Sequence, residues 1–347
     1  MSGPAAARPV AARPRQRSYL LHVGLFLATF LTTTAAGALY VHGQNIRPIA
    51  DGLPYSVPLL MILVCHEFGH YFAARAHGVD ASLPFFIPLP PGLGLGTMGA
   101  VIGMRNVTRD RRKLIDIGAA GPLAGLGMAI PIILYGLSLS KVAPAVPHSI
   151  QEGNSLLYAL LKFMAKGAWL PGHNQDVFMH PTAWAGWAGL LVTMINLMPI
   201  GQLDGGHIAT AYFGNGYRVV ARRLHRLLPL AALAVFVWVY LNVRREAGTR
   251  WDWVEGAIIA FGGALPWVVW YVIVAAVGRL GGGPDHPPVD EQPLPRSRRF
   301  LFWVVVVAFI GIFMPVPYRE TLAGSDAAAA PGATAAGADA TVNPPAP

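Results

Sequence analysis

The sequence predicts an all-α polytopic membrane protein with about seven transmembrane helices. Of the 347 residues, 54% are hydrophobic and only 12% are charged, about half the charged share of an ordinary soluble domain. The mean hydropathy is +0.47, and several runs approach the roughly 20 apolar residues that cross a bilayer. These observations exclude a disordered chain, a disulfide-stabilised scaffold and an ordinary soluble enzyme. The single cysteine, Cys65, allows no intrachain disulfide.

Seven apolar runs are the candidate spans: residues 19–41, 55–76, 114–139, 183–212, 227–243, 256–278 and 300–316. The first run is longer than the apolar core of a cleaved signal peptide, so we expect it to remain as a helix. A cytoplasmic N-terminus places 18 of the 26 Lys and Arg residues on the cytoplasmic side, as the positive-inside rule favours. The net charge of +9 therefore reflects membrane orientation, and no nucleic-acid partner is expected.

Composition divides the chain into five predicted parts. They are a disordered basic cytoplasmic arm (1–18), the membrane core (19–280), a cytoplasmic linker (281–299), a last helix (300–316) and a low-complexity tail (317–347). The tail consists mostly of Ala, Gly, Pro and Thr and cannot bury a core. Residues 140–182 are expected to form an outside loop too short for an independent domain.

One stretch between the second and third runs is apolar but cannot form a continuous helix. Residues 83–104 read LPFFIPLPPGLGLGTMGAVIGM, in which four prolines and many glycines break any helix. The second half favours extended backbone, which cannot face lipid and must be buried in protein or line a wet cavity. We predict a re-entrant loop or a β-hairpin, with a plain cytoplasmic loop as the alternative.

The second run carries the clearest chemical signal, VCHEFGHYFAA. His66 and His70 are four residues apart and share one helix face, where two imidazoles can ligate one metal ion. Glu67 follows the first histidine and can act as a general base toward water at that metal. Ionisable residues at membrane depth are costly and are functional by default. The alternative is a polar contact between helices that is satisfied inside the bundle.

A metal site of this type needs a third protein ligand and an open position. The fourth run contains NLMPIGQLDGGHIA, where Asp204 is the only acidic residue between about 183 and 226. A lone carboxylate at membrane depth needs a partner, and a divalent cation is the strongest one. His207, three residues later, is a rival ligand. Both runs are expected to cross from outside to inside, so His66 and Asp204 can reach one site in the inner half of the bilayer.

Together the two motifs resemble the site-2 protease family of intramembrane zinc metalloproteases. HEFGH and NLMPIGQLDGG match the zinc-binding segments of that family, and GTMGAVIGMR followed by DIGAAGPLAG resembles its bacterial and chloroplast branch without a PDZ domain. The resemblance covers roughly residues 55–215. It implies one Zn²⁺ per chain, with His66, His70 and Asp204 as ligands, Glu67 as the catalytic base and Asn196 as a residue that orients substrate or stabilises the oxyanion.

The predicted function is cleavage of a transmembrane segment by a zinc endopeptidase, in regulated intramembrane proteolysis. An extended substrate is expected to pair with the edge formed by Gly96, Thr97, Met98, Gly99 and Ala100. The resemblance implies a single-pass membrane protein as substrate, such as an anti-sigma factor or a tethered regulator. The expected location is the bacterial inner membrane, because the Ala, Gly, Pro and Arg bias suggests a GC-rich bacterial genome.

Three alternative functions remain at this point. A non-catalytic membrane scaffold is disfavoured because the candidate ligands and Glu67 are all present. A metal transporter could use the same three ligands as a transit site, but it would have no need of Glu67. Another HExxH membrane metalloprotease usually takes a glutamate as its third ligand, and no suitable glutamate occurs in a later apolar run.

Overall fold

The computed structural model describes residues 17–43, 48–92, 94–104, 108–144, 150–172, 175–248, 251–280 and 288–320. Most of the predicted basic arm, the first part of the predicted linker and nearly all of the predicted tail lie outside these residues. The DHPP segment at 285–288 lies outside them except for its last residue.

The described chain is mostly helical. Its helices are α1 (Arg17–His42), the 3-10 turn η1 (Ile49–Gly52), α2 (Leu53–Ala76), α3 (Arg111–Leu139), α4 (Leu156–Lys166), α5 (Pro181–Asn196), α6 (Asp204–Phe213), α7 (Tyr217–Ala247), α8 (Trp253–Leu280) and α9 (Arg296–Ile312). Its strands are β1 (Phe85–Pro88), β2 (Thr97–Val101), β3 (Lys141–Pro144), β4 (Ile150–Glu152), β5 (Gln175–Phe178) and β6 (Tyr318–Glu320).

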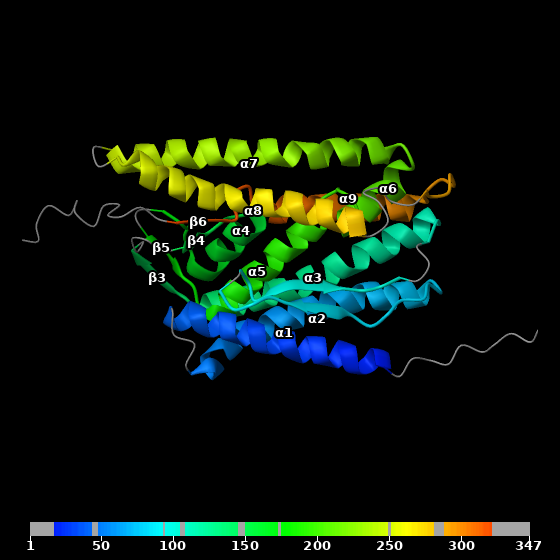
Figure 1. Cartoon of the computed structure of the whole chain (residues 1–347), viewed down its shortest axis with the longest axis horizontal. Helices are drawn as coiled ribbons and strands as arrows, with labels where there is room; N and C mark the ends of the chain where they lie inside the picture. Colours follow the sequence, from blue (N-terminus) through cyan, green and yellow to red (C-terminus); the bar gives the residue numbers. More distant parts are fainter. Residues whose placement is uncertain are drawn as a thin grey trace, which may run out of the picture.

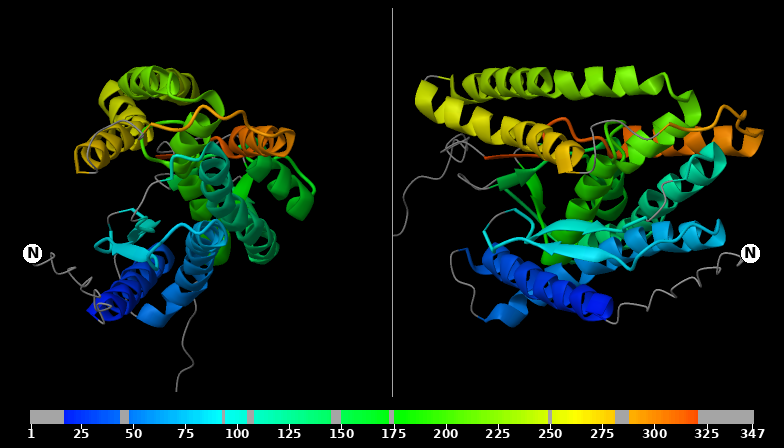
Figure 2. Two further views of the ribbon diagram at one scale, coloured as in Figure 1. Left: turned by 90° about the vertical axis from the view of Figure 1, so that its right-hand side faces the viewer. Right: turned by 45° about the vertical axis from the view of Figure 1, so that its right-hand side comes forward.

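The helices form a bundle with α3 and α5 at its centre. Helices α1 and α2 lie together along one long side, and α7 and α8 lie together along the opposite side (Figures 1 and 2). Helix α3 packs against both α2 and α5, so it is the common neighbour of the two elements expected to carry chemistry. The antiparallel pairs β3–β5 and β4–β6 gather at the end of the bundle where α3 ends and α5 begins.

Five helical segments in the described chain are long and apolar enough to cross a membrane: Tyr19–His42, Ile49–Ala76, Arg111–Leu139, Tyr217–Ala247 and Trp253–Ala276. This finding supports the predicted polytopic membrane protein, but it does not confirm a count of seven spans. The run at 300–316 corresponds to α9, which has 17 residues. The run at 183–212 is divided into α5, with 16 residues, and α6, with 10.

The break between α5 and α6 has a local cause. Pro199 has no backbone N–H to donate, and Gly201 has a φ of +58°, so residues 197–203 form tight turns instead of continuing the helix. A Cβ atom at Gly205 would lie 2.1 Å from the Leu197 carbonyl oxygen, and one at Gly206 would lie 2.3 Å from the Gly201 carbonyl oxygen. The two glycines therefore let α6 begin directly against the turn.

The proline- and glycine-rich stretch contains an antiparallel pair, β1–β2. Phe85 is opposite Val101 and Phe86 is opposite Ala100, with an irregular register before Pro88 and Thr97. The pair lies against α1, where the Phe26 and Phe86 rings meet edge to face. Near its turn, the Thr32 hydroxyl of α1 donates to the Gly96 carbonyl oxygen. Of the re-entrant loop and the β-hairpin that the sequence predicts, the structure contains paired strands. Whether this segment re-enters the bilayer stays a prediction.

Candidate metal centre

Helix α2 brings its two histidines to the interface with α3. His66 and His70 are one helical turn apart and only 2% and 7% exposed. Helices α2 and α3 approach closely here: a Cβ atom at Gly69 would lie 2.6 Å from the Ala120 carbonyl oxygen. Only glycine fits at this position. Because both histidines are buried, their imidazoles project into the bundle.

Asp204 reaches the same point from α6. Its carboxylate oxygen Oδ2 lies 3.2 Å from His66 Nε2 and 3.2 Å from His70 Nε2. The two Nε2 atoms are also 3.2 Å apart. Among the described residues, these three side chains are the one group of His, Cys, Asp and Glu with the spacing of a metal site.

The chemistry and spacing of this donor set fit zinc. Nitrogen and oxygen ligands about 2.0–2.1 Å from a tetrahedral zinc ion lie about 3.3–3.4 Å from one another, close to the three separations observed. Two imidazoles and one carboxylate are also a ligand set typical of catalytic zinc sites, which keep a fourth position for water or substrate.

Backbone contacts fix the protonation of His70. Its Nδ1 lies 2.7 Å from the Ile117 carbonyl oxygen, which can only accept a hydrogen bond. Nδ1 therefore carries a proton, and Nε2 is the ring atom that faces His66 and Asp204, where it can bind a cation when it is deprotonated. Three electron-rich atoms in mutual contact repel one another unless a cation or a proton lies between them. The arrangement is therefore favourable to a bound cation.

Two further predicted site residues lie beside this cluster. Glu67 is 4% exposed and, among the residues that the structure describes, its carboxylate makes no hydrogen bond. Asn196, the last residue of α5, has its amide Nδ2 3.3 Å from His66 Nε2. The structure thus brings the Asn196 amide beside the cluster, although its catalytic role remains a prediction.

The predicted substrate edge lies next to the cluster rather than in it. Strand β2 contacts α2, and a Cβ atom at Gly99 would lie 4.0 Å from the Val192 side chain, one turn before Asn196 on α5. Thr97 is buried and Met98 is 48% exposed, so the side chains alternate between the bundle and its surroundings. Within the described chain β2 pairs with β1 alone, which leaves its second edge open.

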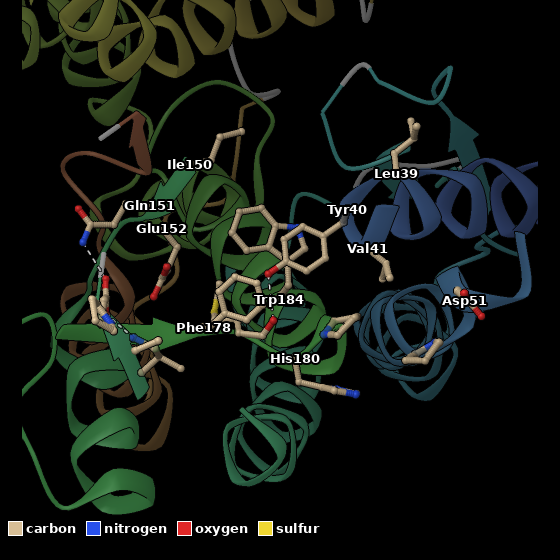
Figure 3. Close-up of a pocket in the computed structure, with 17 residues that line it drawn as sticks. Leu39, Tyr40, Val41, Asp51, Ile150, Gln151, Glu152, Phe178, His180 and Trp184 are labelled. Atoms are coloured by element: carbon tan, nitrogen blue, oxygen red, sulfur yellow. Dashed lines mark hydrogen bonds between the residues drawn. The ribbon is translucent and has the colours of Figure 1, made fainter. Parts of the chain in front are cut away.

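A cavity of about 730 Å³ lies elsewhere, among Tyr40, Glu152, His180, Trp184 and other residues near β4 and β5 (Figure 3). Trp184 is twelve residues before Asn196 on α5, about 18 Å along the helix. The cavity is therefore separate from the histidine cluster. His207, the rival third ligand, is also absent from the group with metal-site spacing.

The profile of Peptidase family M50 matches residues 54–239, more than half of the chain. The matched region holds HEFGH, the LDGG segment and the intervening α3, which are the elements that meet at the cluster. The chain belongs to peptidase family M50. The predicted resemblance to the site-2 protease family is thus confirmed.

Curated relatives agree with this M50 assignment. The chain is 37% identical over 281 residues to "Probable zinc metalloprotease EGY1, chloroplastic" of Arabidopsis thaliana, covering 79% of this chain and 45% of that protein. It is 28% identical over 291 residues to the Arabidopsis thaliana protein of the same description named EGY2, covering 82% and 45%. The M50 chain therefore spans less than half the length of these relatives. No solved structure matches it significantly.

The relatives also bear on location. The family and the five long apolar helices indicate an integral membrane protein. Both relatives are named chloroplastic, so they do not support the bacterial inner membrane expected from composition.

Sequence reasoning missed two contributors to the M50 site. One is the Ile117 carbonyl, whose role depends on tertiary contact and leaves no mark in a single sequence. The other is Gly121, where a Cβ atom would lie 2.1 Å from His70 Nε2. A signal for it was present in DIGAAGPLAG, one of the segments that carry the family resemblance.

Proposed function

We propose that the chain is a zinc endopeptidase that cuts a transmembrane segment of a membrane-tethered protein. The observation that carries the proposal is the position of the cluster. His66, Glu67 and His70 lie within α2, which is long and apolar enough to span a bilayer, and Asp204 joins them from a broken helix. Burying four ionisable groups in such a helix bundle is costly unless they serve a function at that depth.

The proposal gives each of these side chains a role. His66, His70 and Asp204 would hold a zinc ion, which would supply the Lewis acidity to activate water and polarise a peptide carbonyl. Glu67 accepts the proton of the attacking water and passes it to the nitrogen of the leaving amine. The Asn196 amide donates a hydrogen bond to the carbonyl oxygen as negative charge develops on it. The Ile117 carbonyl keeps His70 in the tautomer that binds metal.

The substrate must unwind before its amide bond can reach this site. We propose that an extended substrate segment pairs with the open edge of β2, at residues Gly96, Thr97, Met98, Gly99 and Ala100. The support is that β2 contacts α2 and lies close to α5, the helix that ends at Asn196. Met98→Pro removes a backbone donor and should sharply reduce cleavage while zinc stays bound, whereas Met98→Ala should act weakly. Equal cleavage by the two variants would refute strand addition.

The substrate class follows from the site's depth. A single-pass membrane protein that releases a soluble domain after cleavage fits a site inside the bundle, so we propose regulated intramembrane proteolysis of a tethered regulator. An anti-sigma factor is one example that the family resemblance implies. The distribution of Lys and Arg supports a cytoplasmic, or equivalent, side for the N-terminus.

One variant tests the proposal against its rival, a metal transporter. Glu67→Gln should keep about one zinc per chain and lower cleavage by roughly 10²–10⁴-fold, because only the proton acceptor is lost. The cleavage assay uses membranes of cells with the wild type or the variant and seeks a protein that accumulates uncut with the variant. Normal cleavage by Glu67→Gln would contradict the protease. Zinc flux through proteoliposomes that is similar for the wild type and Glu67→Gln would support the transporter instead.

A further inference from the structure

Helix α4 exposes a row of apolar side chains but buries a lysine, which is unusual for a helix in water. Leu156, Leu160 and Met164 are 70%, 44% and 62% exposed and follow one another at intervals of four residues. Residues at this spacing form one continuous stripe. In contrast, Lys162 is fully buried. A stripe of apolar side chains on α4 thus faces outward, while Lys162 faces the protein together with Tyr158 and Leu161.

The inward polar groups are all held by the protein. The Lys162 ammonium lies 3.3 Å from Glu152 and 3.6 Å from Asp176, and it sits over the Tyr158 ring. The Tyr158 hydroxyl donates to Glu152. Lys166 donates to the Ser140 carbonyl oxygen at the end of α3. No charged side chain of α4 is therefore left on its outward face.

The stripe continues into a groove between α4 and α9. The groove has a volume of about 650 Å³ and is lined mainly by apolar side chains, among them Leu156, Ala159, Trp169, Phe309, Ile310 and Phe313. Asn154 and Ser155 are its polar lining residues. Trp169 stacks on Phe163 at the end of α4 and is 63% exposed, a position typical of tryptophans at a membrane interface.

We infer that α4 is embedded in the membrane interface, with lipid acyl chains covering its outward stripe and filling the groove against α9. Lipid fits better than water because exposing this apolar stripe to water is unfavourable. It fits better than a protein partner because protein interfaces carry a polar rim, whereas Asn154 and Ser155 are the only polar side chains among the described residues that line the groove. The surface is also continuous with spanning helix α3, which α4 contacts and whose Tyr135 and Leu139 are exposed.

The inference changes the topology expected from sequence. Residues 140–182 were expected to form a solvated outside loop, yet α4 would lie within the lipid at this end of the bundle. Helix α4 has 11 residues, too few to span a bilayer, so it would lie in the interface like other amphipathic membrane helices.

Site-directed fluorescence in proteoliposomes tests the placement. Because Cys65 is the only cysteine, Cys65→Ala provides a background for single-cysteine variants at Leu160, Met164 and Ile310, each labelled with bimane. Lys141→Cys on β3 is the matched control, because this residue is exposed and lies at the same end of the bundle. Zinc content and melting temperature identify variants that fold like the parent.

We expect lipids brominated in their acyl chains to quench the labels at 160, 164 and 310 several-fold more than the label at 141. Aqueous iodide should show the reverse order. Iodide quenching at 160 and 164 equal to that at 141 would overturn the inference. Lipid quenching at 310 alone would also overturn it, because α9 would then face lipid while α4 faced water. Neither result depends on proteolysis, so the test stands apart from the proposed function.

Discussion

Gly121 offers the sharpest test of the metal centre, because alanine there would place a methyl group on a ligand atom. The new Cβ atom would lie 2.1 Å from His70 Nε2, whereas ordinary contact begins at 3.4 Å, so the imidazole must move by about 1.3 Å. The ring is anchored by its Nδ1 hydrogen bond to the Ile117 carbonyl oxygen. Moving the His70 imidazole away from the new methyl group would strain that hydrogen bond and draw Nε2 away from His66 and Asp204.

The expected loss is therefore specific to the site. Overpacking a core costs about 1–3 kcal/mol of folding free energy. Replacing glycine with alanine inside a helix gains up to about 1 kcal/mol, so Gly121→Ala should still fold. In contrast, a displacement of about 1 Å in a catalytic group can lower a rate by about 10²-fold. We expect Gly121→Ala to lose most of its zinc and to cut substrate at least 10²-fold more slowly.

Two glycines of the same helix provide matched controls. A Cβ atom at Gly127 would meet nothing within 4 Å, and one at Gly125 would lie 3.2 Å from His66 Nδ1. Zinc per chain, cleavage of a transmembrane substrate and melting temperature should therefore be unchanged in Gly127→Ala, moderately reduced in Gly125→Ala and most affected in Gly121→Ala. Wild-type zinc content and cleavage in Gly121→Ala would refute the assignment of His70 as a ligand in this geometry.

Other substitutions separate ligands, catalytic groups and structural charges. Asp204→Ala should lose zinc and cleavage together, while His207→Ala should keep both; the opposite result, read by elemental analysis and cleavage, would exchange their roles. Asn196→Ala should keep zinc and lower kcat by about 10²–10³-fold, and an unchanged kcat would remove it from the mechanism. Lys162→Met should lower the free energy of unfolding by about 3–5 kcal/mol, because a buried carboxylate loses its counter-ion. Burial raises the pKa of Glu152 and Lys162 opposes that rise, so adding Glu152→Gln should restore much of the lost melting temperature.

The long helices could be predicted because a helix that spans a bilayer needs about 20 apolar residues, and such a run can be recognised in the sequence. The runs at 19–41, 55–76 and 114–139 correspond to α1, α2 and α3 with only small differences at their ends. Helix α7 begins ten residues before the predicted 227 because its arginine-rich first turns are good helix formers, although they are too polar to count as a span. Helix α4 was missed because, with 11 residues, it is too short to be recognised as a membrane span. A hydropathy scan also cannot show that Lys162 points inward.

The candidate ligands could be predicted because metal chemistry restricts both residue type and spacing. His66 and His70 had to share a helix face, and Asp204 was the lone carboxylate in its run. Their distances could not be predicted, since they depend on a break that lets α6 start beside α2. The close approach of α2 and α3 could not be predicted either, because a glycine in the sequence does not show which residue packs against it. Gly121 is informative for this reason: the His70 imidazole occupies the space that a Cβ atom at position 121 would fill.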